Sequence, residues 1–221
     1  MWQKLYQELS RHNFTVIAVA LDEPEAARPW VEAASPTYPC LIDRDHHVAE
    51  LYHIVNVPQA TWIDEAGHIV RPPENAGSSD AFRYMDRTTG QMSPEQVEER
   101  VHMKSVYVEA IRDWVLKGKD SEHAFDKDAA RAHLRLPDAG AARAHAHFRL
   151  AQHLKLKGND DEAALHFAEA SRLHPRSWNI FRQSATKAAS GLAAGQDFWT
   201  RVDALGKEAY HLPIDMKGIR R

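Results

Sequence analysis

The chain has 221 residues, of which 43% are hydrophobic and 27% are charged, and its formal net charge is −3. This length suffices for one large domain or two small ones, and the small net charge excludes a strongly basic surface for nucleic acid or for an anionic membrane. The sequence also contains no apolar run of the roughly 18 residues that a membrane-spanning helix needs.

The sequence has a single cysteine, Cys40, which excludes an intramolecular disulfide. Folding therefore does not require an oxidising compartment. The first residues lack the basic start and the apolar run of a secretory signal. We expect a cytoplasmic protein, and a longer natural N-terminus that carries a signal is the alternative left open.

The first third of the chain alternates between helical and extended patterns. Residues 2–9 place apolar side chains at i, i+3, i+4 and i+7, which predicts a helix. Residues 14–21 form a near-continuous apolar run with three β-branched residues, which predicts a strand buried on both faces of a sheet. Residues 23–34 are helical in composition, with Asp22 as a candidate cap. Pro29 predicts that this helix begins or bends near that position.

A second strand, a short helix and a hairpin follow. Residues 40–43 predict a strand and residues 47–54 a helix. Residues 60–70 predict a hairpin whose turn is Glu65-Ala66-Gly67, because glycine readily adopts the positive φ of a tight turn. The order α-β-α-β-α-β-β indicates an α/β domain with a mixed sheet, which we place at residues 1–75.

Residues 71–80 are rich in proline and polar residues, which is typical of a linker, and we assign the linker to residues 76–92. Ser93, Pro94 and Gln96 together predict the start of a helix through an N-cap and a capping box. Gly118 is expected to end that helix. Its predicted apolar face consists of Val97, Val101, Val108, Ile111 and Val115.

The remaining sequence is helical in pattern up to residue 206, and residues 144–177 resemble one tetratricopeptide repeat. Gly158 makes the turn of this helical pair and Pro175 ends it. The residues that match the repeat are Leu150, Ala151, Leu154, Ala163, Phe167 and Ala170. Trp178 to Ala189 is a candidate half-repeat. The repeat is either part of a peptide-binding groove or a helical buttress, and one copy favours the buttress because a groove needs several stacked repeats.

Residues 93–206 are thus predicted to form an all-helical, tetratricopeptide-like domain, followed by an extended C-terminal tail at 207–221. A tail of this composition is more often docked or frayed than a binding arm.

The first seventy residues resemble the thioredoxin-fold redoxins of the TlpA/ResA and AhpC/TSA types. The segments that carry the resemblance are the helix 2–9 with the strand Phe14–Asp22, the stretch Tyr38–Asp45, and the hairpin Val55–Gly67 with its Val-Pro. The resemblance implies a thioredoxin-like fold that lacks its first strand and redox motif. It also implies a cis Val57–Pro58 bond and a substrate-facing wall formed by Val57 and Pro58.

In these redoxins the Cys-x-x-Cys motif lies at the N-terminus of the first long helix, where the helix dipole and free N–H groups lower the thiol pKa. By resemblance that position lies just before Met1, and the sequence contains no Cys-x-x-Cys. Two explanations stay open. The protein is a redox-inactive fragment, or the gene starts upstream with a cysteine or selenocysteine motif whose UGA codon was read as a stop. We favour the second.

Few other residues qualify for chemistry. Cys40 is a weak candidate nucleophile, and its place at a strand end favours packing as a small hydrophobe. Asp22 and Asp64 are expected to cap turns. The histidines at 46, 47, 53, 145 and 147 lack the spacing of a metal site and are expected to be solvated, and Trp62, Trp114, Trp178 and Trp199 are expected to pack.

The function implied by the resemblance is a thiol–disulfide or selenol-based oxidoreductase with antioxidant activity, for which these 221 residues alone are expected to be inactive. The contrasting possibility is a redox-inactive protein-interaction module that uses the helical region. We expect no cofactor, no metal, no nucleic acid and no membrane partner. Both functions are compatible with a protein or peptide partner that either contains a disulfide or is bound by the helical repeat. The sequence leaves the oligomeric state open.

Overall fold

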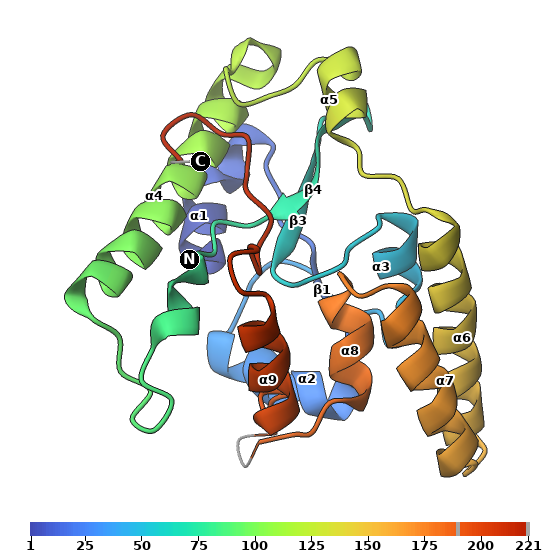
Figure 1. Cartoon of the computed structure of the whole chain (residues 1–221). Coiled ribbons are helices and arrows are strands. Elements are labelled where there is room, and N and C mark those ends of the chain that lie inside the picture. Colours follow the sequence, from blue (N-terminus) through green and yellow to red (C-terminus); the bar gives the residue numbers. More distant parts are fainter. Residues whose placement is uncertain (189–190, 220–221) are drawn as a thin grey trace. The chain divides into compact units, whose positions relative to one another are not determined.

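The computed structural model describes residues 1–188 and 191–219 and divides the chain into two compact units (Figure 1). Unit 1 comprises residues 1–48, 58–134 and 212–221. Unit 2 comprises residues 49–57 and 135–211. Each unit therefore combines segments that are far apart in the sequence.

The helices and strands of the first third follow the predicted order. They are α1 Trp2–Leu9, β1 Ala18–Ala20, α2 Pro24–Ala34, β2 Cys40–Ile42, α3 His47–Leu51, β3 Gln59–Ile63 and β4 Ile69–Asn75. The later helices of unit 1 are α4 Pro94–Lys117 and α5 Lys127–His133, and those of unit 2 are α6 Ala139–Leu156, α7 Asp160–Leu173, α8 Trp178–Ser184 and α9 Gln196–Ala204. The division between the units passes through α3. Short 3₁₀ turns lie at residues 10–12, 80–84 and 118–120.

The strands of unit 1 form two separate two-stranded sheets. Strands β1 and β2 run parallel, with Ala18 opposite Cys40 and Ala20 opposite Ile42. The prediction of a strand buried on both faces is wrong, because Ile17 is 58% exposed and Leu41 on β2 is 53% exposed. A pair of three-residue strands offers too little surface to be covered on both faces, as larger parallel sheets are.

Two helices of the first third differ from expectation. Helix α2 begins at Pro24 with Glu23 as its N-cap, so Asp22 is not the cap residue, and the helix passes through Pro29 with one backbone hydrogen bond missing. Helix α3 ends at Leu51 instead of Ile54. His46 and His53 flank it with φ values of 55° and 50°, and this left-handed backbone interrupts the helix on both sides.

The hairpin of β3 and β4 is confirmed. Asp64 accepts hydrogen bonds from the N–H groups of Ala66 (3.0 Å) and His68 (2.8 Å), and Gly67 has a φ of 82°. Strand β4 continues to Asn75, so residues 71–75 are strand and not linker. Its two prolines lie next to shifts in the β3–β4 register, which is where a strand tolerates a missing N–H.

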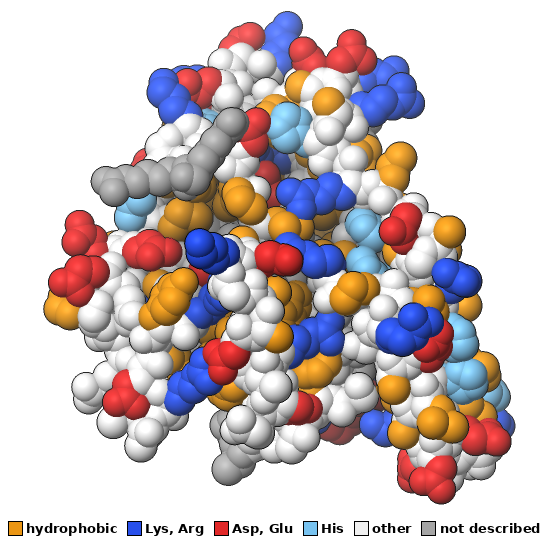
Figure 2. Space-filling view, viewed as in Figure 1, with side chains coloured by type: hydrophobic (Ala, Val, Ile, Leu, Met, Phe, Trp, Pro, Cys, Tyr) orange, Lys and Arg blue, Asp and Glu red, His pale blue; other side chains and the backbone are white. Residues whose placement is uncertain are grey.

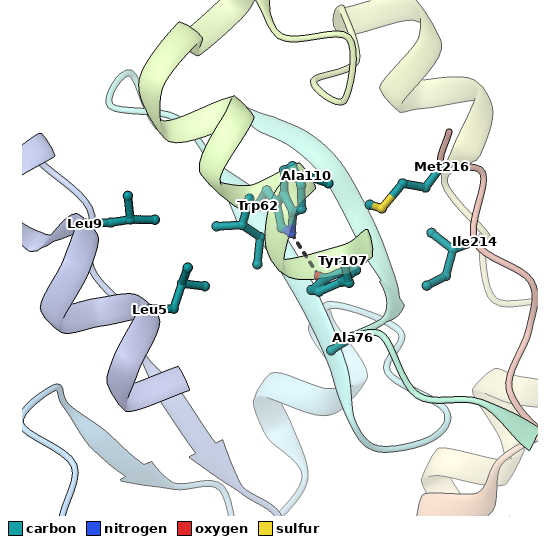
Figure 3. Close-up of a cluster of buried hydrophobic side chains, with 9 residues drawn as sticks. Leu5, Leu9, Trp62, Ala76, Tyr107, Ala110, Ile214 and Met216 are labelled. Atoms are coloured by element: carbon teal, nitrogen blue, oxygen red, sulfur yellow. Dashed lines mark hydrogen bonds between the residues drawn. The ribbon is translucent and has the colours of Figure 1, made fainter. Parts of the chain in front are cut away.

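The core of unit 1 forms around Trp62 of β3 (Figure 3). The indole Nε1 of Trp62 donates a hydrogen bond of 2.9 Å to the hydroxyl of Tyr107 on α4, and its ring stacks on Trp114 at 5.0 Å. The other buried members of this cluster are Leu5, Leu9, Ala76, Ala110, Ile111, Ile214 and Met216. Two of them, Ile214 and Met216, belong to the C-terminal segment, which is docked by its apolar side chains. Arg220 and Arg221 of the predicted tail lie outside the described residues.

Helix α4 begins and ends where the sequence predicts. Ser93 and Gln96 form the capping box, and Gly118 is the C-cap residue. The predicted apolar face is partly wrong, because Val101 is 62% exposed and Val97 is exposed as well. The other predicted residues do pack, because Ile111 is buried and Val108 and Val115 are partly buried against the core. The helix also buries Tyr107 and Ala110, which the prediction does not include. Most residues in the N-terminal half of α4 are exposed.

Unit 2 contains an α6–α7 hairpin that lies where the sequence predicts a helical pair (Figure 1). Phe148 and Phe167 meet edge to face with ring centroids 5.8 Å apart, and Ala151, Ala163 and Ala170 are buried beside them. Leu150 is 42% exposed, so this residue does not pack as the repeat pattern predicts. Assignment of this hairpin to the tetratricopeptide repeats stays a prediction, as do the domain boundaries. Ala189 of the candidate half-repeat lies outside the described residues.

Candidate functional site

The predicted substrate wall is exposed. Pro58 immediately precedes β3, and its carbonyl oxygen accepts a hydrogen bond of 3.2 Å from the N–H of Ala76. Val57 is the last residue of the unit 2 segment, and its N–H donates to the side-chain oxygen of Asn56 at 2.9 Å. Both side chains are open to solvent, as a substrate-facing role requires. The cis geometry of the Val57–Pro58 bond and the substrate role of both residues stay predictions.

Cys40 begins β2 and is exposed. The prediction that it packs as a small hydrophobe is therefore wrong. Its Sγ lies 3.8 Å from the carbonyl oxygen of Tyr38. Strand β2 pairs with β1, whereas Pro58 leads into β3 in the other sheet. Exposure makes Cys40 accessible to reagents, but an activated thiol also needs an electropositive setting.

The turn and packing roles predicted from the sequence are largely confirmed. The N–H of His68 is the main cause that lowers the pKa of Asp64, and this carboxylate caps the hairpin turn. Trp62 and Trp178 are buried, and Trp114 packs against Trp62. Asp22 accepts a hydrogen bond from the N–H of Glu23 before α2 begins.

Arg71 on β4 is a buried charge of unit 1 that the sequence pattern does not reveal. Its side chain is 1% exposed and makes a bidentate pair with Glu74, with an Nε–Oε1 distance of 2.5 Å. It also donates to the carbonyl oxygens of His123 (2.6 Å) and Asp215 (2.7 Å), between the rings of Trp62 and Phe125. Burial raises the pKa of Glu74, and the Arg71 guanidinium opposes this shift. Each of the three guanidinium nitrogens donates to a partner within unit 1, so we interpret this cluster as structural.

A second cluster that sequence spacing does not reveal lies in unit 2. His174, which caps the C-terminus of α7, stacks on His53 with ring centroids 5.6 Å apart and lies 6.3 Å from His145. Burial lowers the pKa of all three, that of His174 to about 4. His53 and His145 are therefore partly buried, contrary to the expectation that they are fully solvated. Their partner in this cluster is far away in sequence, so local spacing carries no signal for it.

His147 of α6 also has a histidine partner. Its Nδ1 lies 2.8 Å from Nδ1 of His166 on α7, a contact that requires one ring to donate and the other to accept. Among residues 1–188 and 191–219, no group of three or more histidine, cysteine or acidic side chains is arranged to hold a metal ion. In the same described ranges, no helix combines the length and the apolar character needed to cross a bilayer.

Part of the chain is similar to a known protein family. The model of the AhpC/TSA family matches residues 1–71, about a third of the chain. Searches of curated proteins and of solved structures found no match. Residues 1–71 are thus similar to the AhpC/TSA redoxins, and this similarity implies a thioredoxin-like fold for that region.

Proposed function

We propose that this protein is a redoxin-type thiol–disulfide oxidoreductase. The observation that carries the proposal is the AhpC/TSA match over residues 1–71. Two features of the same region support it: the α1-β1-α2-β2-α3-β3-β4 order, and the exposed Val57–Pro58 before β3. The TlpA/ResA-like subtype and an antioxidant role are finer parts of the same proposal.

The reaction needs a nucleophile and a group that resolves the covalent intermediate. A thiolate or selenolate attacks one sulfur of a substrate disulfide, the S–S bond breaks, and the other sulfur leaves as a thiolate that takes up a proton. A second thiol then attacks the mixed bond and releases the reduced substrate, which leaves the pair of groups oxidised until an external dithiol reduces it. Cys40 has no second cysteine in the sequence to serve as that partner.

The proposal therefore assigns the redox groups to a motif ahead of α1, where the free N–H groups of a helix N-terminus stabilise a thiolate or selenolate. Val57 and Pro58 would contact the substrate. Their exposed side chains and adjacent backbone suit an extended peptide or a mixed disulfide.

The genomic DNA upstream of the Met1 codon tests this assignment. We expect an in-frame segment that encodes a β-strand followed by either Cys-x-x-Cys or a motif containing a UGA codon for selenocysteine. Sequencing this region in the source genome suffices. If the DNA contains neither motif in frame, the assigned position of the redox groups is wrong.

A redox-inactive interaction module is the second candidate, and one feature of unit 2 favours it. Leu156 of α6 and Leu165 of α7 are each 71% exposed, and Figure 2 shows hydrophobic and histidine side chains over these helices. Such side chains could contact a protein or peptide partner. An assay for disulfide reduction separates this candidate from the first.

A further inference from the structure

The segment 53–57 is bound to the N-terminus of α8 within unit 2. The carbonyl oxygen of Val55 accepts hydrogen bonds from the backbone N–H groups of Trp178 (2.7 Å) and Asn179 (3.2 Å). The side-chain amide of Asn179 donates to the carbonyl oxygen of Ile54 at 2.7 Å. The first N–H groups of a helix have no partner inside the helix, so this segment satisfies donors that α8 itself leaves open.

The histidine cluster of His53, His145 and His174 lies at the same place. The rings of His53 and His174 are nearly parallel, at 11°, and the segment 53–57 begins with His53. Nε2 of His174 is buried and has no hydrogen-bond partner among the described residues. Its ring therefore lacks the partner that would stabilise an added proton at that nitrogen.

The charges around the cluster do not compensate for protonation. Asp138 and Glu50 are the acidic groups that act on these rings, whereas Arg135, Arg149 and Arg201 oppose a further positive charge. Glu50 is also already paired with Arg149. Protonation of one ring in the cluster would in addition place a positive charge beside the other two.

We propose that the histidine cluster is a pH-sensitive contact that holds the segment 53–57 against α7 and α8 while the rings are neutral and releases this segment in mild acid. This inference rests on the contacts within unit 2 and not on the proposed redox function.

The direction of the pH effect follows from the difference in the histidine pKa values between the bound and the released arrangement. Burial lowers the pKa of His174 to about 4, below its ordinary value of 6.5, so the bound arrangement favours the neutral ring. The stabilisation is complete above the ordinary value and is lost as the pH falls from there toward the lowered value. At about pH 5.5, the shift of His174 alone weakens the bound arrangement about tenfold. His53 and His145 act in the same direction.

Hydrogen exchange of the full chain, read by mass spectrometry, tests the inference. Protection factors are compared at about pH 7.5 and about pH 5.5, after correction for the intrinsic exchange rate at each pH. We expect the protection of peptides covering 53–57 and 174–180 to fall about tenfold in acid, whereas α4 keeps its protection. An unchanged protection of both peptides in the wild-type chain would overturn the inference.

Two substitutions separate titration of the cluster from a general effect of acid. His174→Gln removes the titrating ring, so the decrease in protection between about pH 7.5 and about pH 5.5 should shrink to less than about threefold. His12→Gln replaces an exposed histidine of unit 1 and should retain the full wild-type fall. If His174→Gln does not fold, His174→Phe replaces it with the same expectation, because phenylalanine keeps an aromatic ring against His53 and does not titrate. If the His174 variant still shows the full tenfold decrease in protection, the histidine cluster is not the pH-sensitive contact.

Discussion

Replacement of Arg71 by alanine lowers the free energy of unfolding of unit 1 by about 3–5 kcal/mol, the range expected when one member of a buried ion pair is removed. Arg71 is fully buried, and its removal takes the bidentate donor away from the Glu74 carboxylate and one donor away from each of the carbonyl oxygens of His123 and Asp215. The loss should include the docked C-terminal segment, because Asp215 lies between the buried Ile214 and Met216. Denaturant unfolding followed by tryptophan fluorescence measures the change, since Trp62 lies beside the guanidinium.

The pH dependence of this loss identifies its cause. In the variant, burial raises the pKa of Glu74 without the opposing effect of Arg71. The resulting penalty is complete above the raised pKa and disappears as the pH falls toward the ordinary value of 4.5, where the carboxyl is protonated in both states. Arg71→Ala should therefore be less destabilising at about pH 5 than at about pH 7.5.

Lys217→Ala provides the matched control, because Lys217 pairs with Glu122 from the same C-terminal segment but at the surface. We expect this control to leave the stability nearly unchanged, because exposed ion pairs contribute little. The double replacement of Arg71 and Glu74 by methionine should recover part of the loss, since no unpaired buried charge remains. Equal effects of Arg71→Ala and Lys217→Ala would show that the buried cluster contributes nothing beyond a surface pair.

Replacement of Phe148 by alanine in α6 is expected to destabilise unit 2 by about 3–5 kcal/mol, as for other large buried aromatic side chains. Phe148 is fully buried and meets Phe167 across the α6–α7 hairpin. The neighbouring alanine side chains are too short to fill the cavity that the substitution creates, so the lost contacts are not replaced. Hydrogen exchange of peptides from α6 and α7 measures the loss of stability within unit 2. A global unfolding experiment would report the stabilities of both units together.

Leu156→Ala is the control for this experiment, since Leu156 also lies on α6 but is largely exposed. Its effect should stay within about 0.5 kcal/mol. A similar loss of protection in both variants would mean that the Phe148–Phe167 contact does not hold the hairpin together.

The features that the sequence predicts correctly are those determined by neighbouring residues. The capping box of Ser93 and Gln96, the turn at Gly67 and the α6–α7 connection at Gly158 all depend on local backbone chemistry. The same holds for the order of helices and strands, because the change from a period of 3.6 to extended runs is visible in short windows.

The features that were missed depend on partners that are distant in sequence. Exposure of Ile17 and Val101 could not be foreseen, because an apolar pattern shows which side chains could be buried but not whether another element covers them. The burial of Arg71 and of His174 carries no local signal, since the carbonyl oxygens of His123 and Asp215 and the ring of His53 come from separate segments. For the same reason, sequence alone placed Cys40 among packed residues although it is exposed.

An assay of disulfide reduction tests the proposed function most directly. It uses the protein purified from its native source, where it is produced from its own gene. We expect catalysed turnover of a peptide disulfide with dithiothreitol as the reductant, and the same turnover in a Cys40→Ser variant, because the redox groups are assigned to a motif ahead of α1. Absence of turnover in the native-source protein would contradict the redoxin function. Turnover that disappears in Cys40→Ser would instead place the nucleophile on β2 and refute the assigned position of the redox groups.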